Sequence, residues 1–452
     1  MHSDSAVYTT VAQGIAHGQL PYRDFVDNKG PLMYFLSVPG ILLGGFTGIW
    51  ITEFLLIFIS VIFAYKTALF FVSKGKSVFT TGCTFIYAIT FFTVSAGVEE
   101  YSLPFLMASM YLFTKFYFSA QHDISLIELM LLGFCFACTL FIRPNVFTFW
   151  MGFCMVIFFE AIIKRRFVLP LKYIFGFCIG ISIAAVPIFL YLYLNGIIND
   201  FINQVIFAGA SRGVQVSGLK ELVKRWFDII NRPYCIIPVI FGIFCCIKEY
   251  KRPDFTFFIG YTFSYLLMIF LFSLSGSDLH FNMTLIPFFV PLLASFIEAL
   301  NSHFLEIKTK NIAIVVLFCV IFSEGLAKYI YNITESLRNK SGKEMIAAGK
   351  IIDTNTTPGD KIISLSNAYI YPFTKRRSVS KYIYQGSGVD HIQGSREEFL
   401  AAVLNDKPAI IATYPADVNW NAGWYAPIYE MIANEYYLLS NENGYYLFKR
   451  KS

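Results

Sequence analysis

The sequence contains a series of long apolar segments separated by short polar loops. These segments run near residues 48–72, 77–96, 102–118, 126–142, 145–163, 171–194, 233–247, 254–274, 281–299 and 311–331. An apolar stretch of about 20 residues is long enough to cross the hydrocarbon core of a membrane as a helix. Only 15% of the 452 residues are charged, whereas a soluble globular protein carries roughly 25%. The sequence therefore predicts an α-helical polytopic membrane protein with about ten transmembrane helices.

The basic residues of the short loops predict how these helices are oriented. Lysine and arginine gather in alternate loops, at Lys74 and Lys76, at Lys164, Arg165 and Arg166, at Lys248, Lys251 and Arg252, and at Lys308 and Lys310. The short loops 97–101 and 275–280 contain neither residue type. Because loops rich in lysine and arginine stay in the cytoplasm, the first 46 residues and the C-terminal segment are expected on the outer face of the plasma membrane. The net charge of +6 is attributed to the cytoplasmic loops, and nucleic-acid binding is not expected.

The first 46 residues are too polar to lie in hydrocarbon and are predicted to form an outer loop with interfacial helices. Apolar positions within 4–17 recur at helical spacing, and Gly18 is expected to end that helix. The apolar stretch 31–46 is short and interrupted by Pro39, which fits a re-entrant or interfacial helix better than a full span. With an even number of spans, residue 1 would lie outside, so we expect a first transmembrane helix to be missing before Asp4.

After residue 332 the pattern changes from apolar spans to alternating helices and strands. Helical patterns at 341–352, 395–405 and 426–435 alternate with strand patterns at 361–366, 408–413 and 444–448. This alternation predicts a small extracytoplasmic α/β domain with a partly parallel sheet. The chain is thus divided into a transmembrane catalytic domain, 1–331, and a C-terminal domain, 332–452, for which recognition or stabilisation is expected rather than chemistry.

Two further stretches have competing interpretations. Residues 219–230 have the pattern of a basic amphipathic helix, which would lie either on the membrane surface or against the other loops. Cys135 and Cys138 have CxxC spacing but occupy an apolar span without polar neighbours. They are interpreted as small buried side chains rather than as a metal or redox pair.

The polar residues of the first outer segment occur in a recognisable order. Asp4 and Tyr8 are followed by Gly18-x-Leu20-Pro21-Tyr22-x-Asp24 and then by Lys29-x-Pro31-x-x-Tyr34. This order resembles the first outer loop of the GT-C superfamily, polytopic glycosyltransferases that use polyprenyl-phosphate sugars and include protein O-mannosyltransferases and lipid A aminoarabinose transferases. The resemblance extends to the helix series and to a small outer C-terminal domain.

The resemblance implies roles for two residues. An acidic residue after the first transmembrane helix is catalytic in that family, and the matching position is Asp4. A lysine before proline recurs in aminoarabinose transferases, which gives Lys29 a role at the donor phosphate. Many members have a second acid beside the first, but here the neighbour is Ser5. The alternative for Asp4 alone is a helix cap, and no residue pattern requires a divalent cation.

Further candidates follow from the predicted topology. Arg143 lies at the outer end of a span, where it would bind donor phosphate or act as an interfacial snorkelling arginine. Glu99 and Glu100 match a second acidic loop that helps bind acceptor or metal in GT-C proteins; the alternative is solvated loop acids. Asp24 is expected to order the loop by pairing with Arg23 or Lys29. The remaining supporting residues are Tyr8 and His280. With its neighbours Asp278 and Asn282, His280 occupies another outer junction, where it would contact donor phosphate or sugar or have a structural role.

Together these features predict a membrane glycosyltransferase of GT-C type. It would transfer a sugar from a polyprenyl-phosphate donor to an envelope glycan, lipid or protein acceptor on the outer face, with inversion and with Asp4 as base. Two alternatives stay open. One is a transporter or flippase of lipid-linked sugars, which would place charges and broken helices near the bilayer midplane. The other is a non-catalytic homologue that binds polyprenyl lipids within an assembly.

Overall fold

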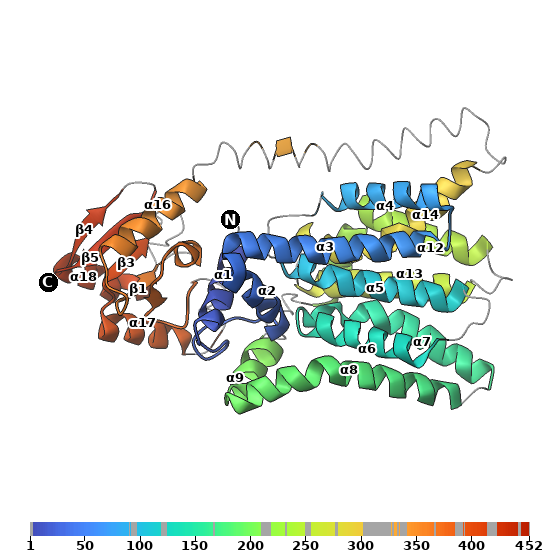
Figure 1. The fold of residues 1–452 in the computed structure, drawn as a ribbon, viewed down its shortest axis with the longest axis horizontal. Helices are drawn as coiled ribbons and strands as arrows, with labels where there is room; N and C mark the ends of the chain where they lie inside the picture. The colour runs from blue at the N-terminus through green and yellow to red at the C-terminus, as the bar shows by residue number, and fades with distance from the viewer. Residues whose placement is uncertain are drawn as a thin grey trace.

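The computed structural model covers most of the chain. It describes residues 3–89, 91, 97–118, 124–165, 168–208, 218–230, 233–248, 255–275, 279–301, 327, 330, 331, 334, 341–365, 368–384, 392, 394–413, 423–441 and 444–451. Most of the molecule is a bundle of long, nearly parallel helices, and the α/β part lies beyond one end of the bundle (Figure 1).

The helices of the bundle follow one another in chain order. They are α3 (Phe46–Ala68), α4 (Lys74–Ala88), α5 (Val98–Phe118), α6 (Leu126–Leu140), α7 (Thr148–Ile163), α8 (Val168–Leu194), α12 (Pro233–Lys248), α13 (Phe255–Ser275) and α14 (Ile286–Asn301). Short 3₁₀ turns, η1 (Pro144–Phe147) and η3 (Leu279–Leu285), lead into α7 and α14. Shorter elements fill the loop after α8, namely α9 (Ile198–Phe201), the π-helix η2 (Ile202–Phe207) and α11 (Leu219–Ile230).

Five helices of the described part of the chain are long and apolar enough to cross a membrane: Phe46–Ala68, Pro144–Ile163, Pro170–Leu194, Phe255–Leu274 and His280–Ala299. Several others, including α6 and α12, are apolar but shorter. Large apolar side chains such as Trp50, Phe175 and Ile247 are exposed on the bundle surface, as expected where lipid is the solvent. The chain is therefore an integral membrane protein, and the predicted polytopic helical fold is confirmed.

The predicted spans agree with the helices except at their ends. Each segment predicted from 48 to 299 falls on a helix, and the predicted span 311–331 lies outside the described residues apart from isolated positions. One boundary matters for the site. Helix α5 begins at Val98, so Glu99 and Glu100 belong to its first turn and not to a loop.

The C-terminal part contains a five-stranded sheet. Its strands are β1 (Lys361–Ser364), β2 (Arg377–Ser378), β3 (Ile410–Thr413), β4 (Tyr436–Ser440) and β5 (Tyr446–Arg450), in the order β2-β1-β3-β5-β4. The pairs β2–β1 and β1–β3 are parallel, and the other two are antiparallel. Helices α16 (Ser341–Thr354), α17 (Ser395–Asp406) and α18 (Ala426–Glu435) accompany it, with the turns η4 (Ala368–Phe373) and η5 (Gly423–Tyr425). The prediction of a partly parallel α/β domain is confirmed, although β2 and β4 were not predicted.

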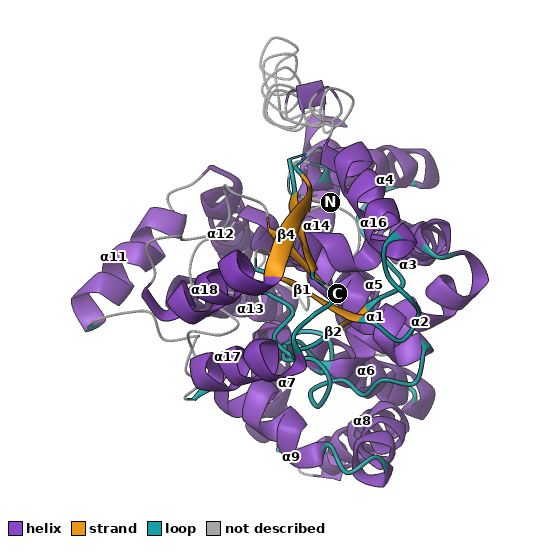
Figure 2. Ribbon diagram, turned by 90° about the vertical axis from the view of Figure 1, so that its left-hand side faces the viewer, coloured by secondary structure: helices purple, strands orange, loops and turns teal. Residues whose placement is uncertain are grey.

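The first segment of the chain lies between the bundle and this sheet. Helix α1 (Ser3–Ala16) and the apolar helix α2 (Pro31–Gly44) occupy the end of the bundle that faces the α/β part (Figures 1 and 2). Val26, in the loop between them, packs in the same apolar cluster as Ile363 and Tyr382, and its amide donates to the carbonyl of Lys381 at 2.9 Å. The loop is therefore held from both sides.

Residues 219–230 form the predicted amphipathic helix, which packs against its neighbours; a place on the membrane surface stays a prediction. Trp226 and Ile229 of α11 pack into the bundle core, while Leu219, Val223 and Phe227 form an exposed apolar stripe on another side. Helix α11 thus contacts its neighbours and also presents apolar surface. Cys135 and Cys138 are both buried in apolar clusters, as the sequence predicted.

Candidate active site

The loop between α1 and α2 is folded by hydrogen bonds to its own backbone and to the π-helix η2. Gly18, with a φ of 83°, follows the end of α1. The carboxylate of Asp24 accepts from the Leu20 amide at 2.7 Å. Gln204 of η2 spans the loop, since its side-chain amide donates to the Tyr22 carbonyl at 2.6 Å and its oxygen accepts from the Asp27 amide at 3.2 Å. These hydrogen bonds hold the loop in one conformation.

The end of this loop is fastened to the end of α6. The Gly30 amide donates to the Ile142 carbonyl at 3.2 Å, and the Leu32 amide donates to the Phe141 carbonyl at 3.1 Å. A Cβ atom at Gly30 would lie 1.9 Å from the Phe141 carbonyl oxygen. Only glycine allows this approach, and it brings Lys29 and Arg143 to the same corner of the molecule.

We expect Gly30→Ala to destabilise the protein by about 1–3 kcal/mol or more, because the added methyl group overlaps backbone atoms that cannot move aside. The measurement is thermal unfolding of the purified protein in detergent, followed by intrinsic fluorescence. Gly75→Ala is the control, since a Cβ at this exposed position of α4 meets no atom within 4 Å. Equal unfolding temperatures for the two variants would contradict the tight contact.

Tyr8, in the middle of α1, lies where the candidate charges meet. Its side chain is 4% exposed, and burial raises the pKa of its hydroxyl well above the usual value. The carboxylates of Asp4 and Asp27 raise this pKa further, and Tyr384 of the C-terminal part does the same. The guanidinium of Arg143 lowers the pKa. The Tyr8 hydroxyl is therefore within electrostatic range of residues from four parts of the chain. These parts are α1, the loop after it, the end of α6 and the α/β part.

Asp4 lies in the first turn of α1 and is exposed. An acidic residue in a first turn is stabilised by the helix dipole, so the position is also favourable for structural reasons. Exposure leaves the carboxylate accessible to a substrate hydroxyl. The geometry is compatible with the predicted role as base, which stays a prediction.

Asp27 is a member of this cluster that the sequence analysis did not single out. Its side chain is buried, accepts from the Tyr34 hydroxyl at 2.5 Å and also accepts from the Asn28 amide at 2.6 Å. Tyr34 lies beside Tyr8, with ring centroids 6.5 Å apart. The available signal was its place two residues before Lys29 in the first outer segment.

We expect Asp27 to make stability depend on pH. Burial raises the pKa of its carboxyl group above the usual value of 3.8, although Lys29 and the Tyr34 hydroxyl lower it. The folded group therefore holds its proton more tightly than the unfolded one. Its contribution to stability is complete below pH 3.8 and is lost as the pH rises through the folded pKa. Asp27→Asn should flatten the decline of unfolding temperature above that pH; parallel curves for the two proteins would contradict this.

Glu99, Arg143 and His280 form the second half of the cluster. The Arg143 guanidinium makes an ion pair with the Glu99 carboxylate, and both side chains are about 5% exposed. His280 Nε2 lies 3.8 Å from Glu99 Oε1. Arg143 also donates to Asn145 Oδ1 at 3.0 Å and lies over the Phe281 ring, 4.0 Å from its centroid. The snorkelling alternative for Arg143 is wrong, because its side chain is enclosed by protein.

Glu100 and Asp24 do not join this cluster in the predicted way. Glu100 is 1% exposed, and its carboxylate lies 2.0 Å from where a Cβ of Gly97 would be, so it turns back over the start of α5. The interpretation of Glu99 and Glu100 as solvated loop acids is wrong, since both are buried in the first turn of a helix. Asp24 orders the loop through the Leu20 amide instead, while the predicted partner Arg23 lies 3.8 Å from Asp200.

The described residues contain no group of three or more histidine, cysteine, aspartate or glutamate side chains placed to hold a metal ion. Asp278 lies outside the described residues, whereas Asn282 is buried in η3. The ionisable groups that the site brings together include carboxylates, the cations of Lys29 and Arg143, the Tyr8 hydroxyl and the His280 imidazole.

An apolar groove of about 490 Å³ opens beside this cluster. Its walls come from α1, α2, α6 and α8 and include Leu32, Phe35, Phe134, Cys138 and Ile188. Leu32 and Cys138 also belong to the stretches that approach each other at Gly30 and Phe141. The groove could therefore hold the apolar chain of a ligand while the polar head lies at the charged cluster.

The fold is similar to that of a solved protein, ArnT from Cupriavidus metallidurans. ArnT from Cupriavidus metallidurans bound to undecaprenyl phosphate matches with a TM-score of 0.65 and 11% sequence identity, over 98% of this chain and 93% of the other. The apo structure of the same enzyme matches with a TM-score of 0.61 and 11% identity, over 98% of this chain and 92% of the other. At this identity the likeness establishes the fold.

The sequence matches the competence-induced Ccs4 N-terminal domain family over residues 4–332, and the chain belongs to this family. No curated protein matches the chain. The matched range begins at Asp4 and extends through the described bundle helices, and the residues after 332 lie beyond it.

Proposed function

We propose that the protein is a membrane glycosyltransferase that takes a sugar from a polyprenyl-phosphate donor and transfers it to an acceptor on the outer face. The observation that carries the proposal is the likeness to ArnT over 98% of the chain, because it includes both the bundle and the α/β part. That ArnT structure holds undecaprenyl phosphate as a bound ligand. The apolar groove beside the charged cluster supports a donor of the same kind.

The chemistry of such a transfer requires two things of the protein. A base must take the proton of the acceptor hydroxyl, and cations must stabilise the departing phosphate. Asp4, exposed in the first turn of α1, is proposed as the base in a single inverting displacement. Lys29, three residues before Leu32 of the groove wall, is proposed to contact the donor phosphate. Arg143 is proposed to add to the positive field, with its charge shared with Glu99.

The remaining residues of the cluster hold these groups in place. The Asp27 carboxylate and the Tyr34 hydroxyl fix the loop that carries Lys29. Tyr8 is within electrostatic range of Asp4, Asp27 and Arg143, and it keeps its proton because burial raises its pKa well above the usual value. The acceptor, whether a glycan, a lipid or a protein, is not specified by these contacts.

The test is a transfer assay with purified protein in detergent. The protein is incubated with a panel of polyprenyl-phosphate sugars, and the release of polyprenyl phosphate is followed by mass spectrometry with candidate acceptors present. Release that depends on an acceptor supports the proposal. A second measurement uses vesicles that contain the protein and a labelled donor. Movement of the donor across the vesicle membrane without any release of polyprenyl phosphate would identify a transporter or flippase of lipid-linked sugars and would overturn the proposal.

A further inference from the structure

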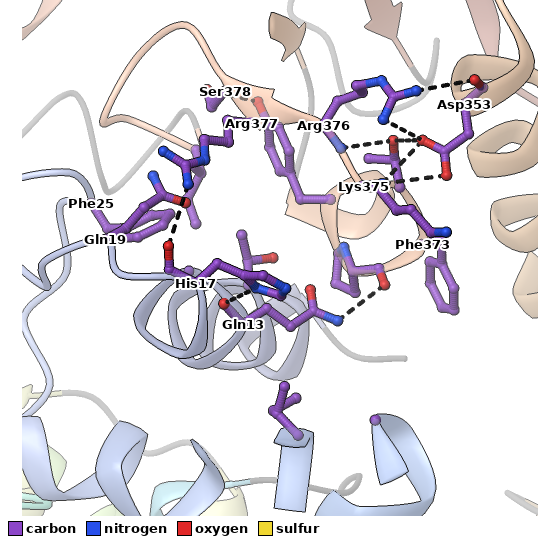
Figure 3. Close-up of a pocket in the computed structure, with 18 of the residues that line it drawn as sticks. Gln13, His17, Gln19, Phe25, Asp353, Phe373, Lys375, Arg376, Arg377 and Ser378 are labelled. Carbon is purple, nitrogen blue, oxygen red and sulfur yellow. Dashed lines mark hydrogen bonds and ion pairs between the residues drawn. The ribbon is translucent and has the colours of Figure 1, made fainter. Parts of the chain in front are cut away.

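A separate cavity of about 770 Å³ lies between the second half of α1 and the C-terminal part of the chain (Figure 3). It is bounded by α1, by the corner between α2 and α3, and by the segment from η4 to β2. Neither Asp4, Lys29 nor Arg143 lines it. Its volume falls within the range of about 300–1,000 Å³ found for small-molecule sites. The bundle and the α/β part thus form a second site between them.

Three consecutive cations, Lys375, Arg376 and Arg377, line one wall of this cavity. Arg376 has a structural role, since its Nε donates to Thr356 Oγ1 at 2.8 Å and its Nη1 lies 3.9 Å from the Asp353 carboxylate. Lys375 and Arg377 are exposed, and within the described residues no carboxylate forms an ion pair with either. Arg377 Nη2 donates to the His17 carbonyl at 3.3 Å. Because a carbonyl is a neutral partner, the charge of Arg377, like that of Lys375, can still be used by a ligand in the cavity.

The other walls offer amide groups and aromatic rings. Gln13 and Gln19 line the cavity on the α1 side, and Gln13 is oriented by donating to the Pro372 carbonyl at 3.3 Å (Figure 3). The rings of Phe46 and Phe373 also line it and stack with centroids 5.1 Å apart. Amides can pair with hydroxyl groups, and aromatic rings can cover the apolar faces of sugar rings. With two cations added, the lining suits a sugar that carries negative charge.

We propose that this cavity binds an anionic saccharide, a phosphate- or carboxylate-bearing glycan, as the acceptor of the proposed transfer. The inference rests on the proposed function. Asp4 and Gln13 are nine residues apart on α1, which corresponds to about 14 Å at 1.5 Å per residue. Ile383 lines the cavity, and the next residue, Tyr384, acts on Tyr8. An extended glycan would therefore lie in the cavity with one end near Asp4.

The test measures binding to the full-length protein in nanodiscs of neutral lipid. The probes are a linear tetrasaccharide carrying one phosphate, the same tetrasaccharide without phosphate, and inorganic phosphate. The phosphorylated tetrasaccharide should bind most tightly. Lys375→Gln/Arg377→Gln should weaken its binding at least tenfold, because both cations available to the phosphate are then removed. Lys343→Gln/Lys350→Gln, which removes two exposed charges of α16 outside the cavity, should leave binding unchanged.

Three results would overturn the inference. One is equal binding of the neutral and phosphorylated tetrasaccharides, and another is unchanged binding by the Lys375 and Arg377 variant. The third is a competitor that binds as tightly as the phosphorylated tetrasaccharide. This competitor would be inorganic phosphate or, in nanodiscs of phosphatidylglycerol, the anionic lipid itself. Comparing binding with transfer separates this inference from the proposed function. Asp4→Asn should bind the phosphorylated tetrasaccharide as tightly as the unchanged protein while losing transfer activity. If the unchanged protein itself binds this probe but transfers no sugar from any polyprenyl-phosphate donor, the result counts against the transferase and not against the saccharide site.

Discussion

Replacing Arg143 by glutamine is expected to destabilise the protein by about 3–5 kcal/mol, because it leaves the Glu99 carboxylate buried without its partner. The measurement is thermal unfolding in detergent. The double variant Glu99→Gln/Arg143→Gln should recover much of the loss, since the uncompensated charge is then absent. The two single variants and the double variant together form a cycle that isolates the interaction between the residues.

The matched control for this experiment is Arg23→Gln. Arg23 also faces a carboxylate, that of Asp200 at 3.8 Å, but the two side chains are 47% and 41% exposed. Such a pair contributes about 0–1 kcal/mol. If Arg143→Gln were no more destabilising than Arg23→Gln, the enclosed pair would not be a structural element of the site.

Asp4→Asn is expected to reduce transfer activity by about 10²–10⁴-fold, the contribution typical of a positioned general base. The side chain is exposed, so its unfolding temperature should stay close to that of the unchanged protein. Activity is measured as acceptor-dependent release of polyprenyl phosphate, after the donor has been identified. The combination of lost activity and kept stability is the expected signature.

Asp200→Asn provides the control for a lost exposed carboxylate at the same end of the molecule, and it should leave activity unchanged. Full activity of Asp4→Asn would remove Asp4 from the mechanism. In that case Asp27, the other acid within range of Tyr8, becomes the residue to replace.

The polytopic helical fold and the mixed sheet were predictable because they depend on local patterns. Long apolar stretches produce helices in lipid wherever they occur, and the alternation of strands and helices after residue 341 indicates a partly parallel sheet. Strand β2 was missed because two residues carry no periodicity. Strand β4 was missed because it follows α18 directly, with no turn residues between them.

The site was predictable only in part, because its contacts join distant parts of the chain. Glu99 and Arg143 are both polar residues at predicted helix ends, yet no spacing rule connects them, and their pairing depends on how α5 and α6 pack. The burial of Asp27 depends on Tyr34, Gln204 and the α/β part together. Residue type and order therefore indicated Asp4, Tyr8 and Lys29, whereas the ion pair and the buried acid required the folded arrangement.

The packing of Val26 has a consequence for how a substrate would arrive. This residue belongs to the apolar core of the α/β part, and its amide is bonded to Lys381. The α/β part therefore covers the loop that carries Asp27 and Lys29. This loop cannot move away without opening that core. Among the described residues, none from the α/β part lines the apolar groove, whose walls come from α1, α2, α6 and α8. We therefore expect the proposed lipid-linked donor to enter laterally from the membrane, with its apolar chain in this groove during transfer.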